Sequence, residues 1–203
     1  MFIFGPIEFV AAMAIQEALL GSRYNPIQQV LSNLGVSPYS YFFNGSIIIL
    51  GIVTFLGVIL TFRMFPRKIT SGVGRIMLIF AGLGAIGVGI FTEHTRPHSF
   101  HGIFAAVAFL SSGIALIFLA NSFRKLPEWA GWPLPTAFGG VFTIAALILF
   151  AVYNGYDGLT ERLIVVPILA WAPMLGWHFW QRLNREATIP PPPTTPPAPV
   201  PSS

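Results

Sequence analysis

Six long apolar segments constrain this chain more than any other feature of its sequence. They lie at about residues 2–20, 42–63, 74–92, 99–121, 136–153 and 162–181. A run of roughly 18 or more apolar residues is long enough to cross the hydrocarbon core of a bilayer as a helix. The six segments occupy most of the 203 residues, which leaves no room for a separate soluble domain. The sequence therefore predicts an all-α, polytopic integral membrane protein with about six transmembrane helices in one bundle.

The composition agrees with this prediction and excludes several other classes of protein. Only 9% of the residues are Asp, Glu, Lys or Arg, whereas soluble domains carry about 25%. The chain contains no cysteine, which excludes disulfides, thiolate metal sites and cysteine nucleophiles. The net charge of +4 does not indicate a nucleic-acid partner, because the basic residues of a membrane protein gather in the loops that face the cytoplasm.

The eleven Lys and Arg residues are divided unequally between the two sides of the predicted bundle. Three lie on one side: Arg23, Arg96 and Arg162. Eight lie on the side that holds both termini: Arg63, Arg67, Lys68, Arg75, Arg124, Lys125, Arg182 and Arg185. Loops rich in Lys and Arg stay in the cytoplasm. We therefore expect a multi-pass protein of the cell membrane with both termini in the cytoplasm.

The end of the chain differs sharply in composition from the spans. Residues 187–203 read ATIPPPPTTPPAPVPSS, and each proline removes a hydrogen-bond donor and fixes φ. Such a segment is typical of a solvated chain similar to polyproline II. The sequence thus predicts a transmembrane domain over residues 1–186 and a disordered, proline-rich cytoplasmic tail over residues 187–203.

The third span carries small residues at regular spacing. Ala81, Ala85 and Gly89 lie four residues apart on one helical face. Small residues at this spacing let helix backbones approach closely in lipid, where packing contacts replace the hydrophobic drive. We predict that this span is a buried central helix.

Polar side chains are concentrated on the side opposite the basic loops. The stretch FTEHTRPHSFHGIFA, residues 91–105, holds three of the four histidines, and the segments 21–40 and 154–162 add amides and charges. Glu17 lies at the same level, whereas Glu8 lies deeper and has no obvious partner in the sequence. A carboxylate at mid-helix costs roughly 2.5–3.5 kcal/mol on insertion scales. We therefore predict a polar layer at the non-cytoplasmic helix ends, and a protonated or interface-reaching Glu8.

Glu93, His98 and His101 are the candidates for catalysis or metal binding in this layer. Pro97 favours a helix start, which puts His98 and His101 three residues apart in the first turn. The positive end of the helix keeps both imidazoles neutral, the form that binds metal or acts as a base. Two imidazoles and a carboxylate would hold a divalent metal with an open water position. The plainer alternative is that these side chains hydrogen-bond carboxylates and carbonyls in a rigid cap.

Glu161 and Arg162 begin the sixth span as an adjacent pair of opposite charge. A helix start favours the acidic member. We expect Arg162 to turn back toward the polar layer and to join a structural salt-bridge network with Glu93 or Asp157.

Four stretches occur in a specific order through most of residues 16–180: YNPIQQVLSNLG, FFNGSIIILGI, GVGIFTE…HGIFAAVAF and GLTER. In this order they resemble a family of uncharacterised prokaryotic membrane proteins catalogued as "domain of unknown function 998". The resemblance implies a multi-helix fold and no established activity. Asn33 stands where the family pattern commonly has Asp, so the carboxylate that would support a metal or acid role is absent there. The motif positions and this neighbour define the predicted polar cluster: Ser32, Asn33, Glu93, His101, Glu161 and Arg162.

Two functions of different classes fit these features. The first is a binding, lipid-interacting, accessory or structural membrane subunit, whose partners are membrane lipids, a larger membrane complex or copies of the same chain. The alternative is a metal-dependent hydrolase that acts on a lipid or small ester at the outer leaflet. A transporter would need a midplane site and broken helices, and the predicted midplane is nearly without charge. A single shared haem is disfavoured because His178 lies at the opposite end from the other histidines.

Overall fold

The computed structural model describes residues 1–97, 99–153 and 155–188. Within these ranges six helices are long and apolar enough to cross a membrane. They are α1 (Phe4–Leu20), α2 (Tyr41–Leu60), α3 (Ile69–Ile90), α4 (Ser99–Phe123), α5 (Pro133–Val152) and α6 (Asp157–Thr188). The connections contain the short 3-10 helices η1 (Gly21–Arg23), η2 (Leu31–Val36), η3 (Phe62–Met64) and η4 (Pro127–Trp129). The predicted all-α membrane bundle is confirmed, and most of the proline-rich tail (residues 189–203) lies outside the described residues.

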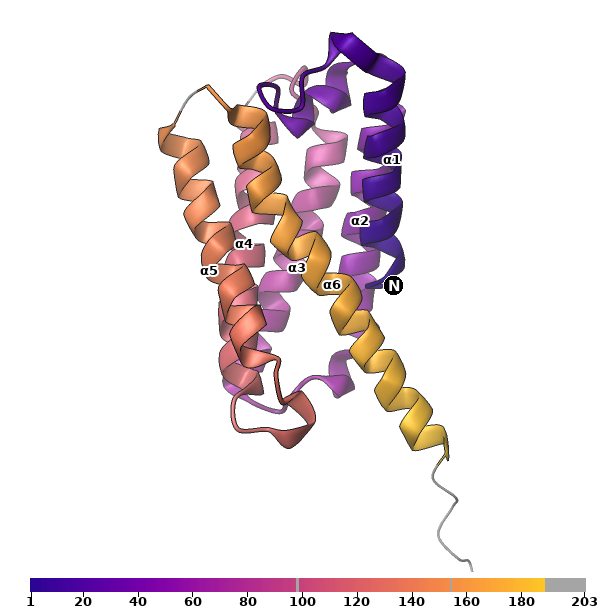
Figure 1. The fold of residues 1–203 in the computed structure, drawn as a ribbon, viewed down its shortest axis with the longest axis vertical. Coiled ribbons are helices and arrows are strands. Elements are labelled where there is room, and N and C mark those ends of the chain that lie inside the picture. The colour runs from indigo at the N-terminus through magenta and orange to yellow at the C-terminus, as the bar shows by residue number, and fades with distance from the viewer. Residues whose placement is uncertain (98, 154, 189–203) are drawn as a thin grey trace, which may run out of the picture.

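Consecutive helices pack against one another, and together they form one bundle with two chemically different ends (Figure 1). One end, upper in Figure 1, carries the connections α1–α2, α3–α4 and α5–α6, and we name it the polar end. The other end carries the connections α2–α3 and α4–α5 together with most of the Lys and Arg residues, and we name it the basic end. Because six spans are an even number, both termini leave the bundle on the same side.

Small residues bring α3 close to both of its neighbours. A methyl group on Gly82 would lie 2.8 Å from the carbonyl oxygen of Gly51 on α2. On the α4 side, a methyl group on Gly84 would lie 2.6 Å from the backbone nitrogen of Ala108. Gly89, one of the small residues singled out in the sequence, approaches the carbonyl of Asn44 in the same way. The predicted packing role of this span therefore agrees with the structure, because backbones this close leave no room for side chains between them.

The 32-residue helix α6 crosses one face of the bundle obliquely (Figure 1). It packs on α5, where Trp171 Nε1 donates a hydrogen bond to Thr136 Oγ1 at 3.0 Å. Further along, Gly176 meets the start of the chain just before α1. Pro167 and Pro173 lie inside the helix, and each removes a backbone donor from its hydrogen-bond ladder. Contacts with α5 and with the chain start therefore fix the course of α6, which closes the bundle between them.

Candidate functional site

The connection between α1 and α2 folds over the polar end and is shaped by its own side chains. The carboxamide oxygen of Asn25 accepts hydrogen bonds from the backbone amides of Ile27 and Gln28 at 3.0 and 3.4 Å. The side-chain oxygen of Gln29 accepts one from the Asn25 amide at 2.7 Å. Asn commonly stabilises turns in this way, by bonding to backbone groups two residues further on. These bonds give residues 24–30, named here the 24–30 loop, a compact shape.

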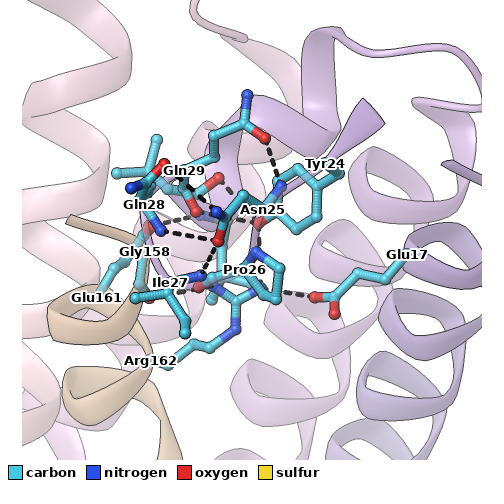
Figure 2. A network of polar contacts seen from close by, with 12 residues as sticks. Glu17, Tyr24, Asn25, Pro26, Ile27, Gln28, Gln29, Gly158, Glu161 and Arg162 are labelled. Atoms are coloured by element: carbon cyan, nitrogen blue, oxygen red, sulfur yellow. Dashed lines mark hydrogen bonds and ion pairs between the residues drawn. The ribbon is translucent and has the colours of Figure 1, made fainter. Parts of the chain in front are cut away.

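Arg162 fastens the 24–30 loop to the helices. Its guanidinium donates to the carbonyl oxygens of Pro26 and Gly158 and, at 3.0 Å, to the hydroxyl of Tyr24. It also forms an ion pair with Glu17 on α1, with 2.6 Å between Nη2 and Oε1. Figure 2 shows Arg162 reaching beneath the loop toward Glu17. One side chain of α6 thus holds both the loop and the end of α1.

This ion pair corrects an expectation from the sequence. We expected Arg162 to pair with Glu93 or Asp157, but its partner is Glu17. The two side chains are 145 positions apart in sequence, and only the packing of α6 near the end of α1 brings them together. With 21% and 27% of their side-chain surface exposed, both members are largely removed from water. Solvent therefore screens the attraction between these two charges less than in an exposed surface pair.

Tyr24 completes the contact between the 24–30 loop and α6. Its hydroxyl accepts a hydrogen bond from Arg162 and donates toward the carbonyl oxygens of Gln29 and Val30, at 3.2 and 3.1 Å. Burial raises the pKa of the Tyr24 hydroxyl above its usual value of 10.0. The phenol therefore stays protonated at neutral pH and keeps its donor.

A second group of polar side chains surrounds η2. Glu161, only 7% exposed, accepts a hydrogen bond from the backbone amide of Leu31. The hydroxyl of the next residue, Ser32, donates to Glu93, which follows α3. This short helix therefore joins the carboxylate of α6 to the carboxylate at the end of α3. We name Ser32, Glu93, His101 and Glu161 the carboxylate cluster.

His101 contributes an imidazole in a defined tautomer. Its Nδ1 lies 2.8 Å from the carbonyl oxygen of Phe91. Because a carbonyl only accepts hydrogen bonds, Nδ1 carries a proton, and in a neutral ring Nε2 would then be the acceptor. The bond also ties the start of α4 to the end of α3. This contact matches the plainer of the two roles predicted for the histidine, a side chain bonded to a backbone carbonyl in the cap.

A cavity of about 110 Å³ extends from the carboxylate cluster into the space between the helices. Ser32, His101 and Glu161 line it at the polar end. Apart from Thr54 and Ser112, the rest of the lining is apolar and comes from α1, α2, α3, α4 and α6, together with Phe2 before α1 and Leu31 of η2. It includes Phe9, Phe43, Leu50, Ala85, Ala105, Val165 and Leu169 and continues to Phe2, Leu116 and Trp171. The polar cluster therefore forms one end of an otherwise apolar cavity inside the bundle.

Gln16 is a structural residue of this end that the sequence analysis did not select. Its side chain is fully buried, with 0% exposed. Nε2 donates to the Leu34 carbonyl at 2.8 Å and to Ser37 Oγ at 3.1 Å, and Oε1 accepts from the Phe43 amide at 3.1 Å. It thereby joins α1, η2 and the start of α2. The feature of the sequence that could have indicated this residue is an uncharged amide within an apolar span, beside Glu17.

Glu8 has a partner that the sequence did not reveal. Ser46 on α2 donates a hydrogen bond to Glu8 Oε1 at 2.7 Å. The other oxygen, Oε2, is buried and has no hydrogen-bond partner within the described part of the chain. A hydroxyl on the neighbouring helix thus meets part of the polar requirement of this carboxyl group.

The predicted site residues fall into three groups. Ser32, Glu93, His101 and Glu161 gather around η2 and the cavity, whereas Arg162 binds Glu17. The third group consists of the other two predicted residues, Asn33 and His98. Asn33 is half-buried, and its side chain makes no hydrogen bond with the residues that the structure describes. His98, a catalytic and metal candidate, lies outside the described residues. Among residues 1–97, 99–153 and 155–188, no group of three His, Asp or Glu side chains is placed to hold a metal ion.

The fold and the site together define a class: a helical, multi-pass membrane protein with a carboxylate cluster at the end of an intramembrane cavity. Comparison with protein families then places the chain itself. It belongs to the family described as "Protein of unknown function (DUF998)", whose family model matches residues 3–178. The matched range includes the whole carboxylate cluster and confirms the resemblance seen in the sequence. No curated protein and no solved structure matched the chain.

Proposed function

We propose that this protein binds an amphiphilic molecule of the membrane, with its apolar chain in the cavity and its head group at the carboxylate cluster. The observation that carries the proposal is the cavity, which joins Ser32, His101 and Glu161 to a long apolar lining. Binding sites for small molecules commonly have this composition, a mainly apolar wall with a few convergent polar groups. The proposed role is that of a lipid-interacting membrane protein.

The energetics of packing support an occupied cavity. An empty cavity of about 110 Å³ costs about 2–3 kcal/mol at roughly 24 cal/mol per Å³. Helix association in lipid relies on packing contacts, so the bundle has no hydrophobic drive of water exclusion to offset this loss. An alkyl chain between Phe9, Phe43 and Leu169 would restore the missing contacts.

The charges of the cluster indicate the chemistry of the head group. The cluster presents two carboxylates, one hydroxyl and one imidazole, and Glu161 is almost fully buried. Arg162, next to Glu161 in sequence, is bound to Glu17 and to backbone carbonyls. A buried carboxylate is stabilised by hydrogen-bond donors and positive charge. The cluster therefore favours an amine or another donor-rich head group over a phosphate or a carboxylate.

Trp171 provides an internal reporter for the proposed chain site, because its indole lines the cavity. We expect a brominated dodecylamine to quench tryptophan fluorescence of the detergent-solubilised protein in a saturable manner, and Trp171→Phe to remove the saturable component. Brominated dodecanoate should bind about tenfold more weakly, which corresponds to about 1.4 kcal/mol. Equal, non-saturable quenching by both probes would contradict the proposal.

Two neighbouring alanines on α4 give a matched pair of variants. Ala105 lines the cavity, whereas Ala106 is exposed on the outside of the bundle. Ala105→Phe should fill the cavity and abolish saturable quenching, and Ala106→Phe should leave it unchanged. Glu161→Gln should remove the preference for the amine over the carboxylate probe. The same affinity for both probes in all three variants and in the wild type would show that the cavity and the cluster do not form the binding site.

A further inference from the structure

A second hollow lies on the outside of the bundle at its basic end. This groove, of about 580 Å³, runs between the end of α4 and the start of α5. Its lining comes from Ile117, Phe118, Ala120, Asn121 and Arg124 on one side and from Pro133, Leu134 and Ala137 on the other. We name it the α4–α5 groove. None of these residues takes part in the cavity or in the carboxylate cluster.

The polarity of the groove changes in one direction along α4. Ile117 and Asn121 lie four residues apart on one face of α4, and Arg124 follows directly after the helix ends at Phe123. At 1.5 Å per residue, the part of α4 from Ile117 to its end is roughly 9 Å long. An apolar floor therefore leads to an amide and then to a guanidinium at the basic end. This order matches the path from acyl chain to head group in one leaflet of a bilayer.

Positive charge is concentrated at the head of the groove. The side chains of Arg124 and Lys125 make no hydrogen bond or ion pair with the described residues. A third cation is fixed beside them, because Lys68 Nζ donates to the carbonyl oxygens of Ser122 and Arg124 at 2.8 and 2.9 Å. The α4–α5 connection contributes one carboxylate, Glu128, against these three cations. The head of the groove is therefore suited to an anion.

We propose that the α4–α5 groove binds one anionic phospholipid, with its phosphate at Arg124 and an acyl chain along Ile117 and Ala137. The groove opens on the outer surface of two membrane-spanning helices, where Leu134 is 80% exposed and Phe118 37%. Lipid is the molecule that surrounds this surface. Its anionic head group matches the unpaired guanidinium, which binds phosphate oxygens in a bidentate manner. The site is independent of the cavity in position and opposite to the carboxylate cluster in charge.

Thermal unfolding in detergent tests this site with two defined lipids. We expect dioleoylphosphatidylglycerol to raise the Tm of the wild-type chain by about 3–5 °C at saturation, and dioleoylphosphatidylcholine to raise it much less. In Arg124→Gln the phosphatidylglycerol concentration that gives half of the shift should rise about tenfold. Arg67→Gln is the matched control, since Arg67 is an exposed cation of the basic end outside the groove. It should respond like the wild type.

A second variant and a second measurement separate lipid binding from folding and from general charge. Ala137→Phe fills the groove without changing its charge and should reduce the number of phosphatidylglycerol molecules retained in native mass spectrometry. The Tm of each variant without added lipid shows whether its fold is intact, and Arg124→Lys should recover part of the lost response. Equal responses to the two lipids, equal effects of Arg124→Gln and Arg67→Gln, or the same Tm shift with inorganic phosphate alone would overturn the proposal. These variants leave the cavity untouched, so failure here does not bear on the amphiphile site.

Discussion

Arg162 is the side chain on which the organisation of the polar end depends. Its replacement by Ala would leave Glu17, the Tyr24 hydroxyl and two carbonyls without their donor. Stranding a partly buried carboxylate is costly, and we expect Arg162→Ala to lower the free energy of unfolding by about 3 kcal/mol. The exposed Arg67 serves as the control, since Arg67→Ala should change stability by less than about 0.5 kcal/mol.

A double-mutant cycle assigns this loss to the ion pair. Glu17→Gln combined with Arg162→Ala should be less harmful than the sum of the two single changes by about 1–3 kcal/mol. The same cycle with Glu93 in place of Glu17 should be nearly additive. Chemical or thermal unfolding in one detergent measures both cycles. Strict additivity in the Glu17 cycle would mean that the ion pair itself does not stabilise the fold.

At the residue scale the sequence indicated which polar groups matter but not how they pair. Ser32, Glu93, His101 and Glu161 were selected because they occupy positions in the motifs that carry the family resemblance, and the structure brings them together. The partner of Arg162 was missed because helix adjacency is set by three-dimensional packing. Gln16 was missed for a related reason, since a buried amide in an apolar span carries no charge to mark it. Pairing depends on distances that spacing along one chain does not contain.

At the scale of elements, Gly158 decides how closely the 24–30 loop can approach the first turn of α6. A methyl group there would lie 2.2 Å from the Gln29 carbonyl oxygen and 2.5 Å from that of Pro26. These are backbone atoms, so Gly158→Ala would displace the whole loop, and we expect a loss of about 1–3 kcal/mol in stability. Gly102, early in α4, has no atom within 4 Å of the same position. Gly102→Ala should therefore be neutral or stabilise the helix by up to about 1 kcal/mol.

The measurement for this pair is again unfolding in detergent, combined with the amide exchange of residues 24–30. Gly158→Ala should increase exchange in the loop, while Gly102→Ala should leave it at the wild-type rate. If the two variants were equally stable, the close approach of the loop to α6 would not contribute to the fold.

The six spans could be predicted from apolar length alone, because an apolar helix in lipid satisfies its backbone hydrogen bonds internally. The ends of α6 were less predictable: its helix continues to Thr188, past the apolar segment that ends near residue 181.

At the scale of the whole molecule, the two ends of the bundle have opposite chemistry. The polar end combines a carboxylate cluster with one end of a largely apolar cavity, and the basic end combines a cluster of cations with an outer groove. The distribution of Lys and Arg along the chain indicated this asymmetry. No feature of the sequence indicated the cavity, because the same apolar side chains would suit a solid core or a lipid-facing surface. The packing of α1, α2, α3, α4 and α6 around the cavity determines which of them face the interior.

The orientation of this asymmetry in the membrane is the last prediction. Eight of the eleven Lys and Arg residues are assigned to the side that carries both termini, and basic loops remain in the cytoplasm during insertion. Reporter fusions should therefore place residues 66 and 190 in the cytoplasm and residue 96 outside. Replacing Arg63 and Arg67 by Gln should weaken this bias without altering the carboxylate cluster. A non-cytoplasmic reporter at residue 190 would reverse the assignment. It would turn the α4–α5 groove toward the outer leaflet, although cytoplasmic leaflets are the ones rich in anionic lipid. The orientation thus decides which leaflet supplies the groove and which supplies the cavity.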